Sequence, residues 1–523
     1  MKKTLLVLCF CSGFTHWASA QENSPIADPP KPNVIAIVAD DLGYADVGFH
    51  DVVADGVRTP HLDKLAKSGV IFKNAYASSP ICSNSRLAIS TGRYQQRWGA
   101  YYYGDGGLPT SESTIAEMMQ EAGYRTMKVG KTHLNFGPKE HPMTHGFEGY
   151  LGFEQHSWDF NLLSQKDVDA YESKSKGSIA IASRKIGIGP LTRNIDQEQS
   201  FENTTTTKVF GRESIQFIKT KSEKPFYLQL EFNAVHTPLY RLPKRLAAKY
   251  EVPERAFDRN AAVWEYPHWD PIAQPDHNAW YSDTCHLVVP DPYGRKIYLG
   301  HLELMDTAIG EILQTLKEDG LAQNTIVIFT VDNGGSDQSY ANNGNLNAYK
   351  YCLMDGGIKV PMVMSWPDQI PEGRHVDATV THRDIFASLS EILGIAPSKP
   401  LDGKSLMPLI SGSADQLHDN ETLFWDSGET QKNWVARQGD WKLVYREEAK
   451  TYQAYQLDDN GLVKTEFRNV PIPNGLQLYN LREDPGETNN LSYSQPEKVA
   501  SLKKQYESWR RQMSDRIRGR DAL

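Results

Sequence analysis

Two apolar runs lie far apart in the sequence, and each ends in a pair of acidic or amide residues. Asn33–Ala39 is followed by Asp40-Asp41, and Thr325–Val331 is followed by Asp332-Asn333. A strand that is apolar throughout is buried on both faces, which is typical of a parallel sheet covered by helices. Ligands of such sheets bind beyond the carboxyl ends of the strands, so the two pairs are expected to meet in one crevice. The sequence therefore predicts an α/β fold with a mostly parallel central sheet.

Other segments extend this architecture and add a second region. Helices are predicted at 61–68, 299–316 and 383–393, and further strands at 69–76, 225–232 and 360–365. The polar residues 164–207 are predicted to form surface loops. Beyond a boundary near 411–419, short aromatic-rich strands at 434–438, 441–446 and 476–481 precede a charged helix at about 496–518. We therefore expect a large α/β domain over residues 21–415 and a smaller C-terminal α+β subdomain over 416–523.

The first twenty residues have the pattern of an export signal. Lys2 and Lys3 precede an apolar run, and Ala18-Ser19-Ala20 form a small-residue cleavage site. We expect residues 1–20 to be removed and the protein to be exported, either periplasmic or secreted. No later apolar run approaches the roughly 20 residues that span a bilayer, so no membrane span is expected.

The charge balance excludes one broad class of function. The 523 residues carry 56 basic and 65 acidic side chains, which gives a formal net charge of -9. Because nucleic-acid binders rely on an excess of basic side chains, nucleic acid is not an expected partner. Beyond the signal segment the chain has the cysteines Cys82, Cys285 and Cys352, too few for a disulfide scaffold.

The two acidic pairs suit a hard metal ion. Asp40, Asp41 and Asp332 supply carboxylate oxygens and Asn333 an amide oxygen, which are ligands that Ca²⁺ and Mg²⁺ prefer. The alternative is that each pair only caps the helix that follows its strand. The shared position at strand ends favours the metal site.

One cysteine-containing segment reads Ser79-Pro80-Ile81-Cys82-Ser83-Asn84-Ser85-Arg86 and continues with Thr91-Gly92-Arg93. It resembles the signature of the type I sulfatases, whose motif cysteine is oxidised to formylglycine. Further motifs of that family have counterparts in the same order: Gly130-Lys131-Thr132-His133, Val235-His236-Thr237-Pro238, Thr330-Val331-Asp332-Asn333-Gly334, Lys350, Asp355-Gly356-Gly357-Ile358-Lys359-Val360-Pro361, Gly439-Asp440-Trp441-Lys442-Leu443, and Leu478-Tyr479-Asn480-Leu481 with Asp484-Pro485. The resemblance covers residues 32–492. It implies an alkaline-phosphatase-like α/β sandwich and a sulfatase that acts with a formylglycine-generating enzyme as its maturation partner.

The resemblance also assigns roles to individual residues. It implies one Ca²⁺, or Mg²⁺, held by Asp40, Asp41, Asp332, Asn333 and an oxygen of the modified Cys82. Arg86 would fix the formylglycine hydrate, and Lys131 and Lys350 would grip the sulfate oxygens. His236 would protonate the departing oxygen, and His133 would take a hydroxyl proton so that the aldehyde is regenerated. These roles match what sulfate-ester hydrolysis needs: a nucleophile, positive charge around the sulfate and an acid.

Asn84 stands where the family motif has proline, and two other readings of Cys82 follow from that departure. Cys82 is either a structural thiol, or a cysteine nucleophile activated at a helix N-terminus beside Arg86. A cysteine nucleophile would leave the two predicted metal half-sites, Asp40-Asp41 and Asp332-Asn333, without a role.

Three rival functions remain at this point. A two-zinc phosphomonoesterase shares the implied fold. Such enzymes typically have a histidine zinc ligand at the position of Asn333, and an amide oxygen there does not favour zinc. A formylglycine-dependent phosphonate monoester or phosphodiester hydrolase is a closer alternative. A non-catalytic sugar-binding protein on this scaffold would follow if Cys82 were not matured.

Residues 263–293 are rich in aromatic and proline residues, which predicts an ordered loop insertion. Such a loop either packs on its own domain or provides aromatic walls for a sugar, since aromatic faces stack on sugar C–H surfaces. We predict substrate contacts from Lys131, His236 and Lys350 and from the rings of Trp269 and Trp280, with Tyr101-Tyr102-Tyr103 as a further wall. The expected substrate is a sulfated carbohydrate, either a polysaccharide or its oligosaccharides.

Overall fold

The two apolar runs form neighbouring parallel strands at the centre of the largest sheet. Strand β1 (Asn33–Ala39) pairs along its whole length with β10 (Thr325–Val331), and every residue of both is buried. The register places Ala39 beside Val331, so Asp40 and Asp332 leave the sheet at the same end. The predicted bounds of both strands, and their meeting at one end of the sheet, are confirmed.

The computed structural model describes residues 31–102, 105, 107–134, 141–154, 159–162, 166, 191–195, 197–201, 204–255, 291–418 and 420–514. The predicted signal segment, Tyr103, Trp269, Trp280 and Cys285 lie outside this part of the chain. Within it, no helix is long and apolar enough to cross a membrane.

The central sheet has 11 strands in the described part of the chain, in the order β11-β2-β12-β10-β1-β9-β3-β4-β6-β7, with β13 paired to β2. Besides β1 and β10, these strands are β2 (Val70–Tyr76), β3 (Arg125–Lys131), β4 (Gly149–Phe153), β6 (Leu191–Arg193), β7 (Gln197–Gln199), β9 (Phe226–Glu231), β11 (Lys359–Val360), β12 (Met362–Ser365) and β13 (Arg374–Thr381). The five central strands β10, β1, β9, β3 and β4 run parallel, and antiparallel strands flank them. The predicted α/β fold with a mostly parallel sheet is confirmed.

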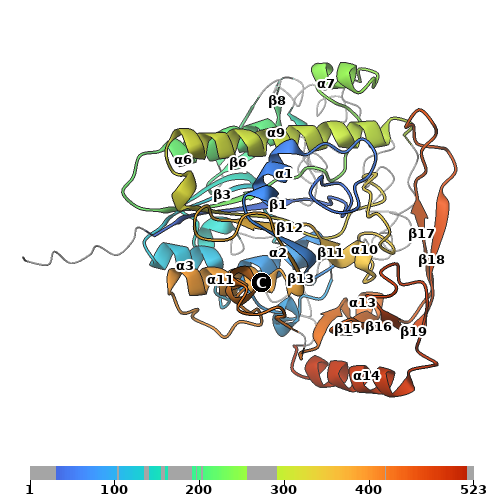
Figure 1. Cartoon of the computed structure of the whole chain (residues 1–523). Helices are drawn as coiled ribbons and strands as arrows, with labels where there is room; N and C mark the ends of the chain where they lie inside the picture. Colours follow the sequence, from blue (N-terminus) through green and yellow to red (C-terminus); the bar gives the residue numbers. More distant parts are fainter. Residues whose placement is uncertain are drawn as a thin grey trace, which may run out of the picture. The chain divides into compact units, whose positions relative to one another are not determined.

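Helices cover both faces of this sheet, as expected for strands without a polar face. Figure 1 shows α1, α6 and α9 on one face and α2, α3 and α11 on the other. Their bounds are α1 (Pro60–Lys67), α6 (Thr206–Lys219), α9 (Gly294–Glu318), α2 (Cys82–Thr91), α3 (Ile115–Glu121) and α11 (Arg383–Leu393). The shorter elements are η1 (Gln95–Trp98), η3 (Pro142–Thr144), η4 (Ala322–Asn324), α7 (Lys244–Lys249), α10 (Asp355–Ile358), α12 (Met407–Ser411), α13 (Gly428–Gln431) and the paired β5 (Asn161–Leu162) and β8 (Thr204–Thr205).

A second, four-stranded antiparallel sheet begins at Leu423. It consists of β14 (Leu423–Asp426), β15 (Asn433–Gln438), β16 (Trp441–Arg446) and β19 (Gly475–Asn480), and the helix α14 (Pro496–Arg510) packs on it. The hairpin of β17 (Lys450–Ala454) and β18 (Arg468–Ile472) lies between β16 and β19 in the sequence. These elements match the predicted short strands, while the boundary placed near residue 415 stays a prediction.

Three predicted segments differ from the structure. Residues 164–207 were expected to be loops, but the described part of this segment contains β6 and β7, which extend the central sheet. Helix α9 begins at Gly294 rather than at residue 299, because Ile297 and Tyr298 already face the core. Helix α14 ends at Arg510 rather than near residue 518, since the backbone N–H of Ser514 leaves the helical path and donates to Gln96.

Candidate functional site

The carboxyl ends of β1 and β10 bring the two acidic pairs into contact. The backbone N–H of Asp332 donates to Ala39 O at 3.1 Å, and the N–H of Asp41 donates to Asp332 Oδ1 at 3.3 Å. Asp41 has a left-handed backbone with φ 58°, a conformation that aspartate tolerates better than most residues. Two half-sites that are far apart in the sequence thus form one cluster.

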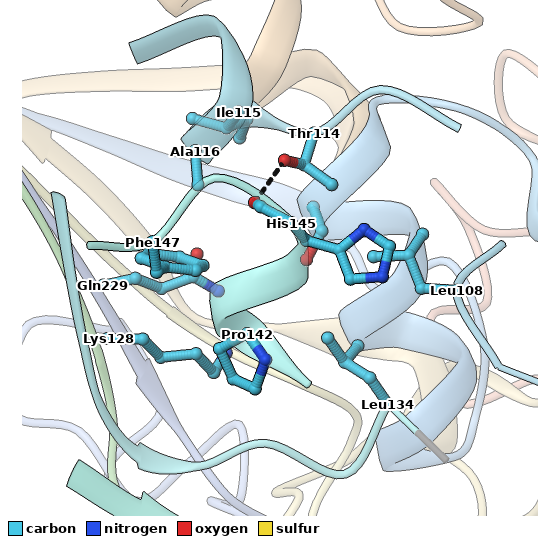
Figure 2. A pocket seen from close by; sticks show the side chains of 11 residues that line it. Leu108, Thr114, Ile115, Ala116, Lys128, Leu134, Pro142, His145, Phe147 and Gln229 are labelled. Atoms are coloured by element: carbon cyan, nitrogen blue, oxygen red, sulfur yellow. Dashed lines mark hydrogen bonds between the residues drawn. The ribbon is translucent and has the colours of Figure 1, made fainter. Parts of the chain in front are cut away.

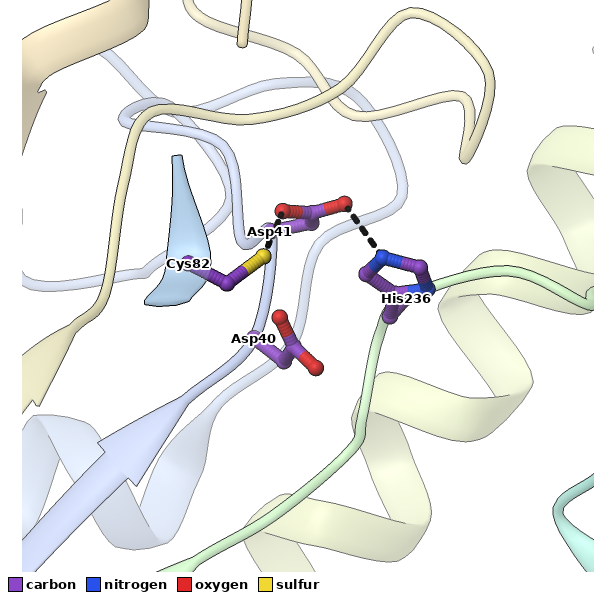
Figure 3. Close-up of side chains that lie close together, drawn as sticks. All are labelled: Asp40, Asp41, Cys82 and His236. Atoms are coloured by element: carbon purple, nitrogen blue, oxygen red, sulfur yellow. Dashed lines mark hydrogen bonds and ion pairs between the residues drawn. The ribbon is translucent and has the colours of Figure 1, made fainter. Parts of the chain in front are cut away.

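Cys82 faces this cluster from the first position of helix α2. Its Sγ lies 3.9 Å from Asp41 Oδ1, and Figure 3 shows the Asp41 carboxylate between the Cys82 thiol and the His236 ring. Burial raises the pKa of the Cys82 thiol well above its ordinary value. A neutral thiol is a poor nucleophile, so this environment does not favour the reading of Cys82 as an activated cysteine nucleophile.

Arg86 lies one helical turn after Cys82, and this spacing of four residues places both side chains on one face of α2. Its Nε and Nη2 donate to Asp332 Oδ2 at 3.1 and 2.7 Å, and Nη2 lies 3.5 Å from Asp40 Oδ1. Burial opposes a charged guanidinium, but the carboxylates of Asp332, Glu231 and Asp40 raise the pKa of Arg86 well above its ordinary value. Arg86 is therefore a permanent cation that binds Asp332, one of the predicted metal ligands.

Two lysines from different segments bind the carboxylates of the first pair. Lys131, the last residue of β3, donates from Nζ to Asp40 Oδ2 at 2.6 Å, and Lys350 donates to Asp41 Oδ2 at 2.8 Å. Both lysines are at most 2% exposed. The two predicted sulfate-binding cations thus lie beside the predicted metal ligands.

His236 completes this side of the cluster. Its Nε2 lies 3.0 Å from Lys350 Nζ and 3.5 Å from Asp41 Oδ2. Its Nδ1 lies 2.8 Å from the carbonyl oxygen of Thr237, and because a carbonyl only accepts, Nδ1 carries a hydrogen. His133 follows β3 two residues after Lys131, with a left-handed backbone at φ 45° and a side chain that is 2% exposed.

A glycine explains how β3 and β9 approach each other at this point. Gly130 has φ 107°, and a Cβ built on it would lie 1.9 Å from the backbone oxygen of Glu231. Only glycine fits such a close approach of two backbones. The glycine of the Gly-Lys-Thr-His motif therefore sets the distance between Lys131 and the neighbouring strand.

The group of close ligand atoms differs from the predicted ligand set. Asp40, Asp41, Cys82 and His236 each offer a ligand atom, and these atoms lie within 4.8 Å of one another. Asp332 is not in this group, because its oxygens accept from Arg86 and from the backbone N–H groups of Asp41 and Asn333. Asn333 Nδ2 donates to Asp41 Oδ1 at 2.8 Å, while its Oδ1 and the Oδ1 of Asp40 are buried without a hydrogen-bond partner in the described residues. Buried acceptor oxygens are costly when they lack a donor, and a cation would satisfy both.

Burial and mutual repulsion shape the charges of the carboxylates. Burial raises the pKa of Asp41 above its ordinary value, against the opposing effect of Lys350. Burial and the nearby Asp40 raise the pKa of Asp332 in the same way. Carboxylates that resist ionisation without further positive charge are typical of ligand-binding sites.

The structure brings together almost the whole predicted set, and it adds one residue. The ten predicted site residues in the described chain are each at most 2% exposed: Asp40, Asp41, Cys82, Arg86, Lys131, His133, His236, Asp332, Asn333 and Lys350. Glu231, at the end of β9, contacts Arg86 Nη1 and was not predicted. Its signal in the sequence is a charged residue ending an alternation of polar residues, Tyr227, Gln229 and Glu231, in a strand that is otherwise apolar.

The predicted aromatic walls have a different outcome. Trp269 and Trp280 lie outside the described residues, so their contacts with substrate stay a prediction. Tyr101 and Tyr102 are each 2% exposed, and the Tyr101 hydroxyl donates to the Ser514 backbone oxygen at 2.7 Å. Tyr101 therefore packs against the C-terminal end of the described chain, and the burial of both rings does not favour the predicted substrate wall.

Comparison with known families gives two matches that overlap. Residues 32–395 match the sulfatase family, and residues 348–514 match the C-terminal region of N-sulphoglucosamine sulphohydrolase. The first match contains every predicted site residue, and the second contains the second sheet and helix α14.

Individual relatives cover most of the chain. N-acetylgalactosamine-6-sulfatase of Canis lupus familiaris is 25% identical over 505 residues, which is 91% of this chain and 84% of the relative. Steryl-sulfatase of Homo sapiens is 27% identical over 471 residues, covering 75% of this chain and 72% of the relative. Among solved structures, Ps i-CgsB in complex with k-i-k-neocarrahexaose is similar with a TM-score of 0.72 and 26% identity, covering 93% of this chain and 94% of that one.

Proposed function

The chain belongs to the sulfatase family and is a sulfuric ester hydrolase, and from this premise we propose that it removes sulfate from a sulfated polysaccharide or its oligosaccharides. The observation that carries the proposal is the pairing of two lysines with the two carboxylates of the first acidic pair. Lys131 and Lys350 bind Asp40 and Asp41, so their ammonium groups lie where a sulfate group beside a bound cation would need positive charge.

We propose that one Ca²⁺, or Mg²⁺, is held by Asp40, Asp41, Asp332 and Asn333 with an oxygen at position 82. Bound there, the cation would offset the three carboxylates and polarise that oxygen. The oxygen atoms of these four residues, and the two buried acceptors that lack a hydrogen bond in the described residues, support a hard cation.

Oxidation of Cys82 to formylglycine is the second part of the proposal. Its hydrate supplies the hydroxyl that attacks sulfur, a reaction for which the neutral buried thiol is not suited. Position 82 lies on the same helical face as Arg86, and the guanidinium of Arg86 donates to Asp332. The side chain at position 82 therefore faces the same cluster. Asn84 stands at the proline position of the motif, and we propose that conversion occurs despite it.

The remaining residues bind the sulfate group and move protons. Lys131 and Lys350 would exchange their carboxylate contacts for sulfate oxygens as the sulfate group enters. His236 carries a hydrogen on Nδ1, and its Nε2 accepts from the Lys350 ammonium at 3.0 Å, so a proton taken from Lys350 at Nε2 would pass to the departing alkoxide oxygen and leave Lys350 to be reprotonated from solvent. His133 would take the proton that is released when the aldehyde forms again.

The carbohydrate part of the proposal draws on two relatives. One is an N-acetylgalactosamine-6-sulfatase, and the other was solved with a neocarrahexaose. We propose that Trp269 and Trp280 contact the sugar rings of the substrate, and that the protein acts after export, as the pattern of residues 1–20 predicts.

The deciding experiment combines mass spectrometry with a substrate panel. The protein is produced together with a formylglycine-generating enzyme, and the peptide containing position 82 is probed with a carbonyl-reactive reagent. Sulfate release is then measured from sulfated oligosaccharides, from a small aryl sulfate and from a phosphonate monoester. We expect a carbonyl at position 82 and the fastest turnover on a sulfated oligosaccharide.

Three outcomes would contradict parts of the proposal. A fully active preparation with unmodified Cys82 would exclude the formylglycine mechanism. Faster turnover of the phosphonate than of every sulfate ester would favour the phosphonate hydrolase. If the aryl sulfate is hydrolysed far better than every sugar, and Trp269→Ala and Trp280→Ala change nothing, the carbohydrate assignment fails.

A further inference from the structure

One face of strand β9 carries an unexpected row of polar side chains. Tyr227, Gln229 and Glu231 alternate along the strand, and all three are at most 3% exposed. The Tyr227 hydroxyl donates to Gln229 Oε1 at 2.9 Å, and Gln229 Nε2 donates to Glu231 Oε1. Burying a polar side chain costs desolvation free energy. We therefore expect the polar row of this central strand to have a role in binding a neighbouring group.

Glu231 is held on both of its oxygens. Lys128 of β3 donates from Nζ to Oε1 at 2.8 Å, and Arg86 donates from Nη1 to Oε2. Burial alone would oppose ionisation, but Lys128 and Arg86 lower the pKa of Glu231 below its ordinary value. Glu231 is therefore a buried, ionised and fully hydrogen-bonded carboxylate.

Lys128 lies on the side of Glu231 away from the reacting residues. Figure 2 shows Lys128 and Gln229 on the wall of a small pocket that is also lined by Pro142, His145 and Phe147. None of the predicted site residues lines this pocket. The ammonium of Lys128 thus contacts Glu231 from this pocket, which is separate from the predicted site residues.

The contacts of Arg86 show what Glu231 does. One edge of the guanidinium, Nε and Nη2, binds Asp332, and the Nη1 corner binds Glu231. Besides Glu231, Nη1 has a contact of 3.5 Å with the Lys131 carbonyl oxygen. Because a guanidinium is planar and rigid, fixing Nη1 fixes the direction of the Nε–Nη2 edge.

We propose that Glu231, held in place by Lys128, is a positioning residue that orients Arg86 toward Asp332 and the nucleophile at position 82. This inference rests on the proposed function, since it assigns the role through Arg86. The pair also keeps the charge balanced: Glu231 alone would add a negative charge next to Asp40 and Asp332, and Lys128 offsets it. Neither residue is among those proposed to touch the substrate.

The test is a set of variants assayed as kcat per mole of carbonyl at position 82, so that changes in maturation do not count. Glu231→Gln is expected to lower kcat by about 10- to 100-fold, the usual cost of removing a residue that orients an active-site group, with KM within about twofold. Lys128→Met should lower kcat by less, Lys128→Arg should restore most of it, and the double variant Lys128→Met with Glu231→Gln should equal Glu231→Gln.

Glu487→Gln is the matched control, because Glu487 also forms a buried ion pair with a lysine, at 2.7 Å from Lys442. We expect it to shift the melting temperature and to leave kcat unchanged. An unchanged kcat in Glu231→Gln, equal losses in Glu231→Gln and Glu487→Gln, or strictly additive losses in the double variant would each overturn the inference.

Two further outcomes are separable. If Glu231→Gln does not fold, the test rests on Lys128→Met and Lys128→Arg. The inference would then be overturned if kcat per mole of carbonyl were the same in both variants as in the wild type. If the wild-type protein with a carbonyl at position 82 releases no sulfate from any substrate, the proposed function fails. An active wild type with indifferent variants contradicts only the positioning role.

Discussion

Two buried clusters of opposite charges occur in this molecule, and they are satisfied to different degrees. In the Lys442 cluster, made of Lys442, Asp355, Glu487 and Tyr76, every carboxylate oxygen has a partner at 2.7 Å. In the site cluster at the ends of β1 and β10, Asp40 Oδ1 lies 3.5 Å from Arg86 Nη2, and the buried Oδ1 of Asn333 has no hydrogen-bond partner in the described chain. The difference separates a cluster whose carboxylates have close partners from one that, as proposed, a bound cation would complete.

The Lys442 cluster connects motifs that lie far apart in the sequence. Lys442 from β16 reaches Asp355 of the Asp-Gly-Gly motif, and the same loop receives a hydrogen bond from Gly334 N to Gly357 O, one residue after Asn333. The second sheet therefore contacts the loop that is hydrogen-bonded to Gly334. The site cluster is the one proposed to bind substrate, while the Lys442 cluster joins the second sheet to this loop.

The largest expected effect is a loss of stability from breaking the complete cluster. Lys442→Met leaves Asp355 and Glu487 buried without their shared cation, which typically costs about 3–5 kcal/mol. Denaturant unfolding measures this change, and kcat of the molecules that remain folded should be unchanged. A large fall in kcat with little change in unfolding free energy would show that the two clusters are not separable in this way.

The converse change in the site cluster should affect activity first. Lys350→Met removes a cation from the sulfate position, and we expect kcat/KM for sulfate release to fall by about 10²- to 10³-fold. Unfolding free energy should change less than in Lys442→Met, because Lys442 pairs with two buried carboxylates whereas Lys350 pairs with Asp41, which keeps its contact with Asn333. Steady-state kinetics and unfolding curves of both variants, measured side by side, test this reversal.

A smaller effect is expected in the pH dependence of stability. Burial, and the charge of Asp355, raise the pKa of Glu487 from 4.5 to about 7, although Lys442 opposes this. A raised carboxyl pKa gives stability that is fully present below about pH 4.5 and is lost as the pH rises to about 7, at most about 3 kcal/mol. Unfolding free energies of the wild type should fall over this window more than those of Glu487→Gln. Parallel curves for the two proteins would contradict this assignment.

The smallest expected effect concerns a ring that lies in neither cluster. Tyr101→Phe removes the hydrogen bond to the Ser514 backbone oxygen, which should cost about 1 kcal/mol. Thermal unfolding measures the loss, and sulfate release from oligosaccharides should stay as in the wild type. A raised KM for sugars alone would instead restore the role of Tyr101 as a substrate wall.

The sequence predicted the elements whose residues obey one simple rule. The bounds of β1, β10 and α11 follow from apolar periodicity and flanking polar residues, and the structure has the same bounds. Because parallel neighbours share a sheet edge, the meeting of Asp40 with Asp332 was also predictable. The edge strand β7 and its neighbour β6 were missed, since their short polar sequences have no apolar face to reveal them.

Glu231 was missed for a different reason. A charged residue after an apolar run is usually the point where a strand meets solvent, whereas Glu231 is completely buried. Its partner Lys128 comes from another strand, where Lys128 lies opposite Gln229 in the parallel register. Pairing of this kind depends on which strands become neighbours, and a single sequence does not contain that information locally.

The burial of Cys82 also limits when its side chain is accessible to another enzyme. In the finished fold its side chain is 1% exposed, and among the groups that enclose it are Asp332 and Lys350, which are synthesised long afterwards. Between positions 82 and 332 the ribosome must add 332 − 82 = 250 residues. At about 5–20 residues per second this takes roughly 12–50 s. Oxidation of Cys82, as proposed, therefore belongs to this interval or to a delay in folding, and a chain that closes around helix α2 too early would remain a well-folded protein without its nucleophile.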